Sequence, residues 1–159
     1  MTPLPKSLRP RYRYLAVTLE TWPDVALDRE AVQAATADAV RGLFGDAGVA
    51  RAEPRVMRFA FADGAGRLIV RTRRESVDVS RAGLAAMDAV EAAPVAVCVR
   101  GISGTVRACE EKYLNGRQLP IEESTVAFED ADRPATVRGN RVDVHLGDAF
   151  AGAMDLDLT

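Results

Sequence analysis

The first regular pattern in the chain is an alternation of apolar and polar residues between positions 12 and 20. This spacing of two is typical of a half-buried strand, whose inner side would carry Leu15, Val17 and Leu19. From Asp28 to Phe44, apolar residues recur three or four positions apart, as they do on one face of a helix. Asp28 can cap the start of that helix, and Gly45 predicts its end.

Two further strands are predicted at residues 55–62 and 67–73, joined by a turn at Asp63-Gly64-Ala65-Gly66. One face of the first strand is expected to carry Arg55, Met57, Phe59 and Phe61. In the second strand, Leu68 and Val70 would lie opposite a face made of Arg67, Ile69 and Arg71. The spacing of later apolar residues predicts a second helix over 77–91 and a fourth strand over 95–100.

This order of elements is that of the ferredoxin-like fold. The expected fold class is α+β, a ferredoxin-like or RRM-like β-α-β-β-α-β sandwich in which two helices cover one face of a four-stranded sheet. A third helix over 105–114 is an addition, with an apolar stripe made of Val106, Cys109 and Tyr113. The open face of the sheet is one place for it to dock; the alternative is that a partner covers that face.

The balance of charge divides the chain near residue 114. Residues 1–114, the expected core domain, contain 17 basic and 14 acidic residues, whereas residues 115–159 contain 4 and 9. We expect the second part to be an acidic, partly ordered C-terminal extension. Strands at 126–128, 135–138 and 142–146 would include a hairpin across Gly139-Asn140. A basic body with an acidic tail is typical of proteins with a polyanionic partner.

Arginine supplies nearly all of the positive charge. The two lysines are Lys6 and Lys112, among 21 basic residues in total. A planar guanidinium binds phosphate through two parallel hydrogen bonds, which an ammonium group cannot do. The bias therefore favours a phosphate-rich partner, although a GC-rich genome that favours arginine codons explains it equally well.

The sequence offers few groups for catalysis. His145 is the only histidine and lies in the extension, so the body lacks a Ser-His or Cys-His nucleophile pair. Cys98 and Cys109, eleven positions apart with no histidine nearby, do not have the spacing of a zinc site. We expect no catalytic residue, no metal ligand and no cofactor bound by the protein itself. The low cysteine content and the lack of a long apolar run favour a cytoplasmic protein without a membrane segment.

The strongest candidate for binding is the stretch from Arg100 to Arg107. Its glycines predict a turn over 101–104 that presents backbone amides at the start of the third helix, where phosphate is attracted. The candidate RNA-binding residues here are Arg100, Ser103, Gly104, Thr105 and Arg107. An ordinary helix cap at Ser103 or Thr105 explains the same sequence.

Two other basic clusters precede this stretch. The N-terminal arm interleaves Tyr12 and Tyr14 with four candidate residues, Lys6, Arg9, Arg11 and Arg13. The third strand ends in three more, Arg71, Arg73 and Arg74. Such arginines can contact phosphates while tyrosines stack on bases. The alternative for the arm is a solvated segment whose tyrosines lie in the core. The alternative for the third-strand cluster is a solvated strand end. The third strand lacks the stacking aromatics of RNA-recognition modules, which favours contact with an RNA backbone or a protein.

Three segments together carry a resemblance to a known family. In chain order they are Leu8-Arg-Pro-Arg-Tyr-Arg-Tyr-Leu15, Val70-Arg-Thr-Arg73 and Arg100-Gly-Ile-Ser-Gly-Thr-Val-Arg107. Over residues 1–114 the chain thereby resembles archaeal ribonuclease P protein component 2. The arginine bias and the acidic extension are similar to those of members from salt-loving archaea.

The resemblance implies a non-catalytic subunit of ribonuclease P, the ribonucleoprotein endoribonuclease that removes the 5′ leader of precursor tRNA. In that family the RNA is the catalyst, for which Mg²⁺ is expected. The implied partners are ribonuclease P RNA, protein component 3, other protein subunits, and precursor tRNA as the substrate of the complex. The competing classes are a small-ligand regulatory or generic RNA-binding module on the same fold, and a standalone nuclease with clustered carboxylates.

Overall fold

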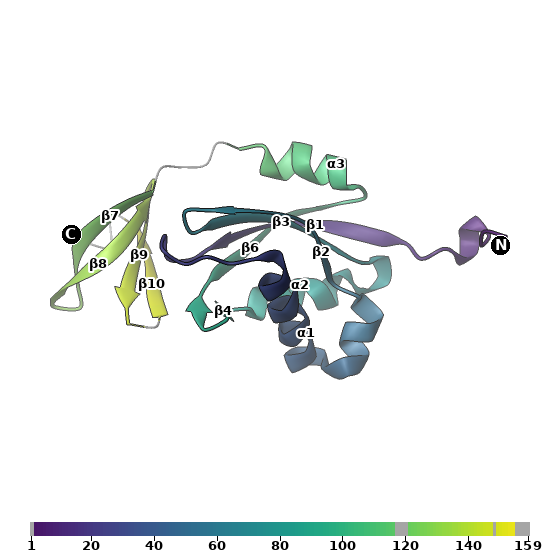
Figure 1. Cartoon of the computed structure of the whole chain (residues 1–159), viewed down its shortest axis with the longest axis horizontal. Coiled ribbons are helices and arrows are strands. Elements are labelled where there is room, and N and C mark those ends of the chain that lie inside the picture. The colour runs from purple at the N-terminus through teal and green to yellow at the C-terminus, as the bar shows by residue number, and fades with distance from the viewer. Residues whose placement is uncertain (1, 117–120, 148, 155–159) are drawn as a thin grey trace.

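The computed structural model describes residues 2–116, 121–147 and 149–154. Its larger part is a four-stranded antiparallel sheet of order β2-β3-β1-β6. The strands are β1 (Tyr12–Glu20), β2 (Arg55–Ala62), β3 (Ala65–Arg73) and β6 (Ala96–Ser103). Helices α1 (Arg29–Ala52) and α2 (Val77–Ala86) lie against one face (Figure 1). The predicted α+β, ferredoxin-like fold is confirmed.

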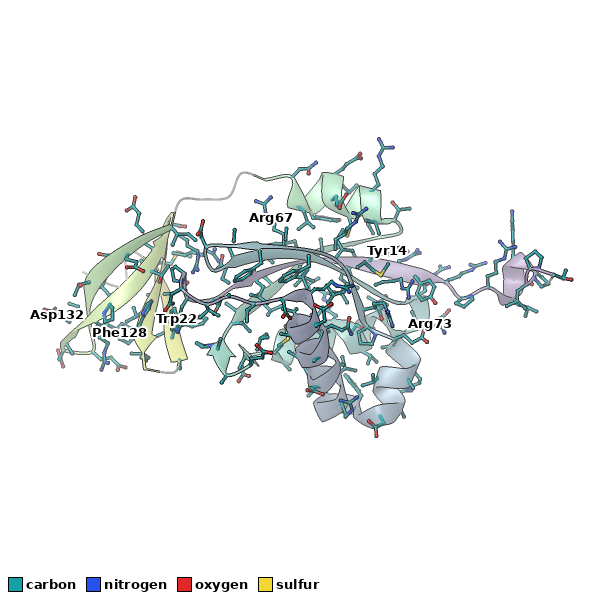
Figure 2. All side chains as sticks on the ribbon, viewed as in Figure 1. Tyr14, Trp22, Arg67, Arg73, Phe128 and Asp132 are labelled. Carbon is teal, nitrogen blue, oxygen red and sulfur yellow. The ribbon has the colours of Figure 1, made fainter. Side chains whose placement is uncertain are left out.

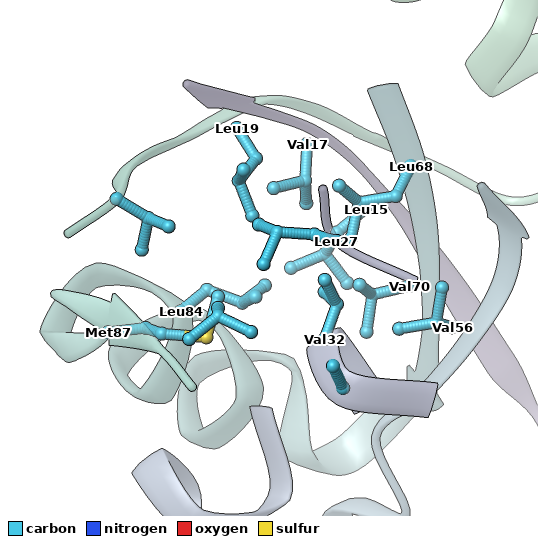
Figure 3. Close-up of a cluster of buried hydrophobic side chains, with 13 residues drawn as sticks. Leu15, Val17, Leu19, Leu27, Val32, Val56, Leu68, Val70, Leu84 and Met87 are labelled. Carbon is cyan, nitrogen blue, oxygen red and sulfur yellow. The ribbon is translucent and has the colours of Figure 1, made fainter. Parts of the chain in front are cut away.

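The main core lies between that face and the two helices (Figure 3). Leu15, Val17 and Leu19 are fully buried, as the alternation along β1 predicts. They belong to one cluster with residues from β3 and both helices, among them Leu68, Val70, Val32 and Leu84. Asp28 caps α1 as expected, because its carboxylate accepts a hydrogen bond of 2.8 Å from the amide of Ala31.

The other face of the sheet is covered by α3 (Val106–Cys109), which continues as a π-helical turn over Glu110–Leu114 (Figure 1). Cys109 is fully buried there with Ala16 and Ile69. This confirms the third helix and places it on the open sheet face. Two arginines of the sheet hold it down: Arg67 donates to the carbonyl of Leu114 at 2.6 Å, and Arg58 lies 3.7 Å from Glu110.

Both long helices end elsewhere than predicted. Gly45, with φ of 71° and ψ of −176°, breaks the helix where expected, but helical turns resume and reach Ala52. Helix α2 stops at Ala86, not near residue 91. The chain instead forms a small hairpin from β4 (Ala89–Val90) and β5 (Ala93–Pro94). Val90 is buried, as its spacing predicted, but it lies in a strand and not in a helix. The burial of one apolar residue does not determine the secondary structure that buries it.

Details of two strands also differ. The hairpin between β2 and β3 turns on Asp63 and Gly64 alone, both with positive φ. A register shift between Val56 and Arg58 interrupts the alternation in β2. Val56 is therefore buried and Met57 is 38% exposed, so the predicted face that joined Met57 to Phe59 is wrong.

The C-terminal residues form a second antiparallel sheet of order β10-β9-β8-β7. Its strands are β7 (Ile121–Phe128), β8 (Ala131–Arg138), β9 (Arg141–Leu146) and β10 (Ala149–Met154). Strands β8 and β9 pair across Gly139-Asn140, the hairpin that the sequence predicted. Strand β10 was not predicted. The expectation that residues 115–159 are only partly ordered stays a prediction, and residues 117–120, 148 and 155–159 lie outside the described residues.

The two sheets meet at the end of β1. The indole of Trp22 lies 3.8 Å from the ring of His145 and 5.0 Å from that of Phe150, measured between centroids. Figure 2 shows Trp22 at this junction, between the sheets. Arg138 of β8 donates to the carbonyl of Thr21 at 2.8 Å. Among the described residues, no helix is long and apolar enough to cross a membrane.

Candidate nucleic-acid interface

Antiparallel pairing gathers arginines at one end of the main sheet. At this end β1 and β2 begin, whereas β3 and β6 finish. Tyr14 pairs with Arg71 on one side and with Ser103 on the other, and Arg55 pairs with Arg71. We call this cluster the basic strand end; it consists of Arg11, Arg13, Arg55, Arg71, Arg73 and Arg74. Figure 2 shows Tyr14 and Arg73 close to where the N-terminal arm leaves the body.

One carboxylate lies within the basic strand end. Glu53 accepts a hydrogen bond of 2.6 Å from Nε of Arg73. This bond, with the charges of Arg73, Arg71 and Arg55, lowers the pKa of Glu53 below its ordinary value. A carboxyl whose pKa is held down by three guanidinium groups shows that the local potential is positive.

Tyr12 orders two of the arginines. The guanidinium carbon of Arg71 lies 4.2 Å from the ring centroid of Tyr12, and that of Arg73 lies 5.4 Å away. Tyr14 packs against the cluster under α3. Tyr14 therefore lies in the core, as the alternative interpretation of the arm held, whereas the ring of Tyr12 holds Arg71 and Arg73 in place.

The predicted turn over 101–104 is wrong. Gly101, Ile102 and Ser103 belong to β6 and pair with β1, because a fourth strand of eight residues is needed to match its neighbour. Thr105 is the N-cap of α3, and its hydroxyl accepts from the amide of Ala108 at 3.1 Å. The ordinary cap is therefore what the structure contains. Ser103, Gly104 and Thr105 still adjoin the basic strand end, since Ser103 pairs with Tyr14.

The two arginines expected to flank the turn do not lie together. Arg100 occupies a bulge of β6, and its Nε donates to the hydroxyl of Thr18 at 3.1 Å, four residues along β1 from Tyr14. Arg107 is 87% exposed on α3 and pairs with Glu111 at 2.8 Å. Arg107 lies two residues beyond Thr105, the N-cap of α3, whereas Arg100 belongs to another part of the sheet.

The N-terminal arm extends beyond the sheet as an exposed segment with a short 3-10 turn over Lys6–Leu8 (Figure 1). Lys6 and Arg9 lie on it, and Nε of Arg9 donates to the carbonyl of Leu4 at 2.8 Å. Arg11 is where the arm joins the body, because its carbonyl accepts from the amide of Arg74 at 2.9 Å. The arm therefore continues the basic strand end outward.

Arg55 is the member of the cluster that the sequence did not identify as a candidate. The two-residue turn at Asp63-Gly64 alone would place Arg55 opposite Thr72, and the register shift between Val56 and Arg58 moves it opposite Arg71. Among the described residues, no group of three or more His, Cys, Asp or Glu side chains is placed to hold a metal ion.

The fold and this surface define a class of protein: a ferredoxin-like domain with ordered arginines at one end of its sheet. The chain belongs to the Rpp14/Pop5 family, which matches residues 13–114. It is 53% identical over 158 residues to ribonuclease P protein component 2 of Natronomonas pharaonis, covering 99% of this chain and 98% of that one. The protein of the same name from Haloarcula marismortui is 50% identical, with 99% of each chain covered.

A shorter relative lacks room for the second sheet. Ribonuclease P protein component 2 of Archaeoglobus fulgidus is 33% identical over 114 residues, which are 72% of this chain and 98% of that one. The resemblance to archaeal ribonuclease P protein component 2 is therefore confirmed, and so is its similarity to members from salt-loving archaea with an extension.

Proposed function

We propose that this chain is a protein subunit of ribonuclease P, the ribonucleoprotein that removes the 5′ leader of precursor tRNA. The observation that carries the proposal is the near full-length identity of about half to proteins named ribonuclease P protein component 2. The basic strand end supports it, because a subunit that works by binding RNA needs ordered cations rather than a nucleophile.

In this proposal the RNA is the catalyst and holds the Mg²⁺ ions, while the protein binds no cofactor. The basic strand end and the adjoining residues Ser103, Gly104, Thr105 and Arg107 contact RNA phosphates. Neutralising those phosphates lowers the repulsion that opposes folding of the RNA, so the catalytic fold forms at a lower Mg²⁺ concentration. Lys6 and Arg9 add contacts along the arm.

The proposed partners are ribonuclease P RNA, protein component 3 and the other protein subunits, with precursor tRNA as the substrate of the complex. The printed name of the relatives, component 2, supports an assembly with several protein components. The proposed compartment is the cytoplasm, where tRNA precursors and their processing enzymes meet.

The test is a reconstitution of leader cleavage from cognate RNA and component 3, with and without this chain. Adding the chain is expected to raise the cleavage rate and to lower the Mg²⁺ concentration required. The double variant Arg11→Gln/Arg74→Gln removes two exposed guanidinium groups that have no side-chain partner among the described residues. Each lost phosphate contact should reduce the salt dependence of RNA affinity by about one in a log–log plot.

The matched control is Arg51→Gln/Arg81→Gln, which removes two exposed arginines outside the basic strand end. It should leave RNA affinity and the cleavage rate unchanged. An unchanged rate when the wild-type chain is added would refute the proposal, and cleavage by the chain without RNA would identify a nuclease instead.

A further inference from the structure

A pocket of about 150 Å³ lies where the C-terminal sheet meets the core, away from the basic strand end. The core contributes Arg67 and Arg100, and the C-terminal sheet contributes Arg138 and Arg141. Its volume corresponds to about five water molecules at their share of liquid volume. Four arginines thus line a space large enough for a small anion, although the guanidinium of Arg67 also donates to the carbonyls of Leu114 and Gly116.

The negative charge in the pocket does not balance these arginines. The lining includes one carboxylate, Glu20. It pairs with Arg141 and lies 3.9 Å from Nη1 of Arg138. Arg138 is also paired with Asp143, outside the lining, so Arg67 and Arg100 have no acidic partner among the described residues. The pocket therefore keeps an excess of positive charge.

Donor groups remain free as well. The side chain of Arg138 is 5% exposed, and its Nε has no hydrogen-bond partner among the described residues. A buried donor without a partner costs about 1–3 kcal/mol, and such groups are found paired in most proteins. Arg100 uses Nε for Thr18, while its two Nη atoms make no hydrogen bond to the described residues. An acceptor in the pocket would give the Nη atoms of Arg100 a partner.

We propose that this pocket is a binding site for a phosphate-class oxyanion, built jointly by the core and the C-terminal sheet. Tetrahedral oxyanions present several acceptor oxygens to guanidinium groups that approach from different sides. The site is distinct from the basic strand end, because Arg100 lies beside Thr18 and not beside Ser103. Two sources share this chemistry: a phosphodiester of bound RNA and a free inorganic anion.

The site needs the extension. Without the second sheet the pocket would lose Arg138 and Arg141, and Glu20 would lose both of its arginine partners. The Archaeoglobus fulgidus relative is too short to hold both the core and such a sheet. An oxyanion in the pocket would bridge cations of both sheets and so fasten the extension to the core.

The test is titration of the full-length chain with inorganic phosphate by calorimetry, against potassium chloride of equal ionic strength. Phosphate should bind the wild type. Arg100→Gln and Arg141→Gln should each weaken that binding about tenfold or more. Arg81→Gln is the control, because Arg81 is an exposed arginine of α2 that does not line the pocket. The folded state of each variant is checked by circular dichroism.

A second arm identifies the source of the anion. If the ligand is an RNA phosphodiester, Arg100→Gln also lowers affinity for ribonuclease P RNA and reduces the salt slope by about one. If it is a free anion, RNA affinity is unchanged while phosphate binding is lost. Absence of phosphate binding beyond the chloride control, or equal loss in Arg81→Gln, would overturn the site. The phosphate arm does not depend on the proposed function, so the two can fail separately.

Discussion

The pairing of Glu53 with Arg73 limits how freely the basic strand end can bind phosphate. The two side chains are linked by a 2.6 Å hydrogen bond, and a phosphate must compete with the carboxylate for that guanidinium. The same pairing raises the pKa of Arg73, so the guanidinium stays charged at any pH of interest. Only the carboxylate can therefore respond to pH.

We predict that Glu53→Gln reduces the loss of stability in acid. The pKa of Glu53 is lowered in the folded state, so its contribution is present above the unfolded pKa and is lost as pH falls through the folded one. The free energies of unfolding of the wild type and the variant should therefore approach each other as pH falls below the unfolded pKa of about 4.3, and meet below the lower, folded pKa. Urea unfolding at a series of pH values measures this.

Glu91→Gln is the matched control for that experiment. Glu91 also has a positive φ, 49° against 44° for Glu53, but it has no arginine partner among the described residues. Its substitution removes a carboxylate from the same kind of backbone position without removing a contact to an arginine. Parallel curves for Glu53→Gln and the wild type would show that the pair contributes nothing.

Single residues also show what could be predicted. The basic clusters at Arg11–Arg13 and Arg71–Arg74 are contiguous in sequence, so local inspection found them. Arg55 joins them only through the register shift between Val56 and Arg58, which no local pattern predicts. The separation of Arg100 from Arg107 depends on a bulge in β6, and no local signal marks that bulge.

Among the helices, α3 depends least on its own length for stability and most on its contacts with the sheet. Its nine residues, including the π-helical turn, are too few for a stable isolated helix. Burial of Cys109 and the hydrogen bonds from Arg67 hold it on the sheet. Burial also raises the pKa of the Cys109 thiol, so the group packs as a neutral apolar residue.

We predict that Gly101→Ala loosens α3. The ring of Tyr113 lies directly over Gly101, and a Cβ there would be 2.2 Å from Cζ of that ring. Because the neighbouring atoms belong to a rigid ring, the helix must shift, at a cost of about 1–3 kcal/mol. Amide hydrogen exchange should show faster exchange in α3 and little change in α1.

Two further variants make that prediction specific. Tyr113→Leu in the Gly101→Ala background should recover part of the loss, since the two effects share one contact. Gly42→Ala in α1 is the control, because a Cβ at Gly42 meets nothing within 4 Å and its φ is not positive. Full protection of α3 in Gly101→Ala would contradict the close packing of Tyr113.

The glycines before this helix led to the wrong prediction of a turn. Gly101 was assigned to a turn because glycine is common in turns, yet here it is required by the close approach of Tyr113 to a strand. The apolar stripe of the helix was predicted correctly. The helix docks on the sheet face that no other element covers. A sequence pattern cannot show which face remains uncovered.

The whole molecule consists of two sheets joined by a compact polar and aromatic junction. Arg138 lies at its centre, with Asp143 and Glu20 as its acidic neighbours and the carbonyl of Thr21 as an acceptor. Burial raises the pKa of Asp143 although Arg138 pulls it down, which shows how dry the junction is. Thr21 and Glu20 are more than a hundred positions from Arg138 in sequence, so the pattern along the chain predicts the hairpin of the extension but not its attachment.

We predict that Arg138→Ala detaches the C-terminal sheet. Removing one partner of a buried ion pair costs about 3–5 kcal/mol. Asp143 would be left buried without its ion-pair partner, whereas Glu20 would keep Arg141. Trp22, the only tryptophan, stacks on His145 at the junction, so its fluorescence reports on this contact. Its emission should shift to the red at a lower urea concentration than the loss of helical circular dichroism, which follows the core.

Arg141→Ala is the control that separates the loss of the buried Arg138 side chain from the loss of one positive charge at the junction. Arg141 lies on the same hairpin and shares the partner Glu20, but its side chain is 43% exposed. An exposed pair of this kind contributes about 0–1 kcal/mol. Equal losses in the two variants would mean that charge, and not the buried position of Arg138, joins the sheets. A coincident fluorescence and dichroism transition in Arg138→Ala would mean that core and extension unfold as one unit.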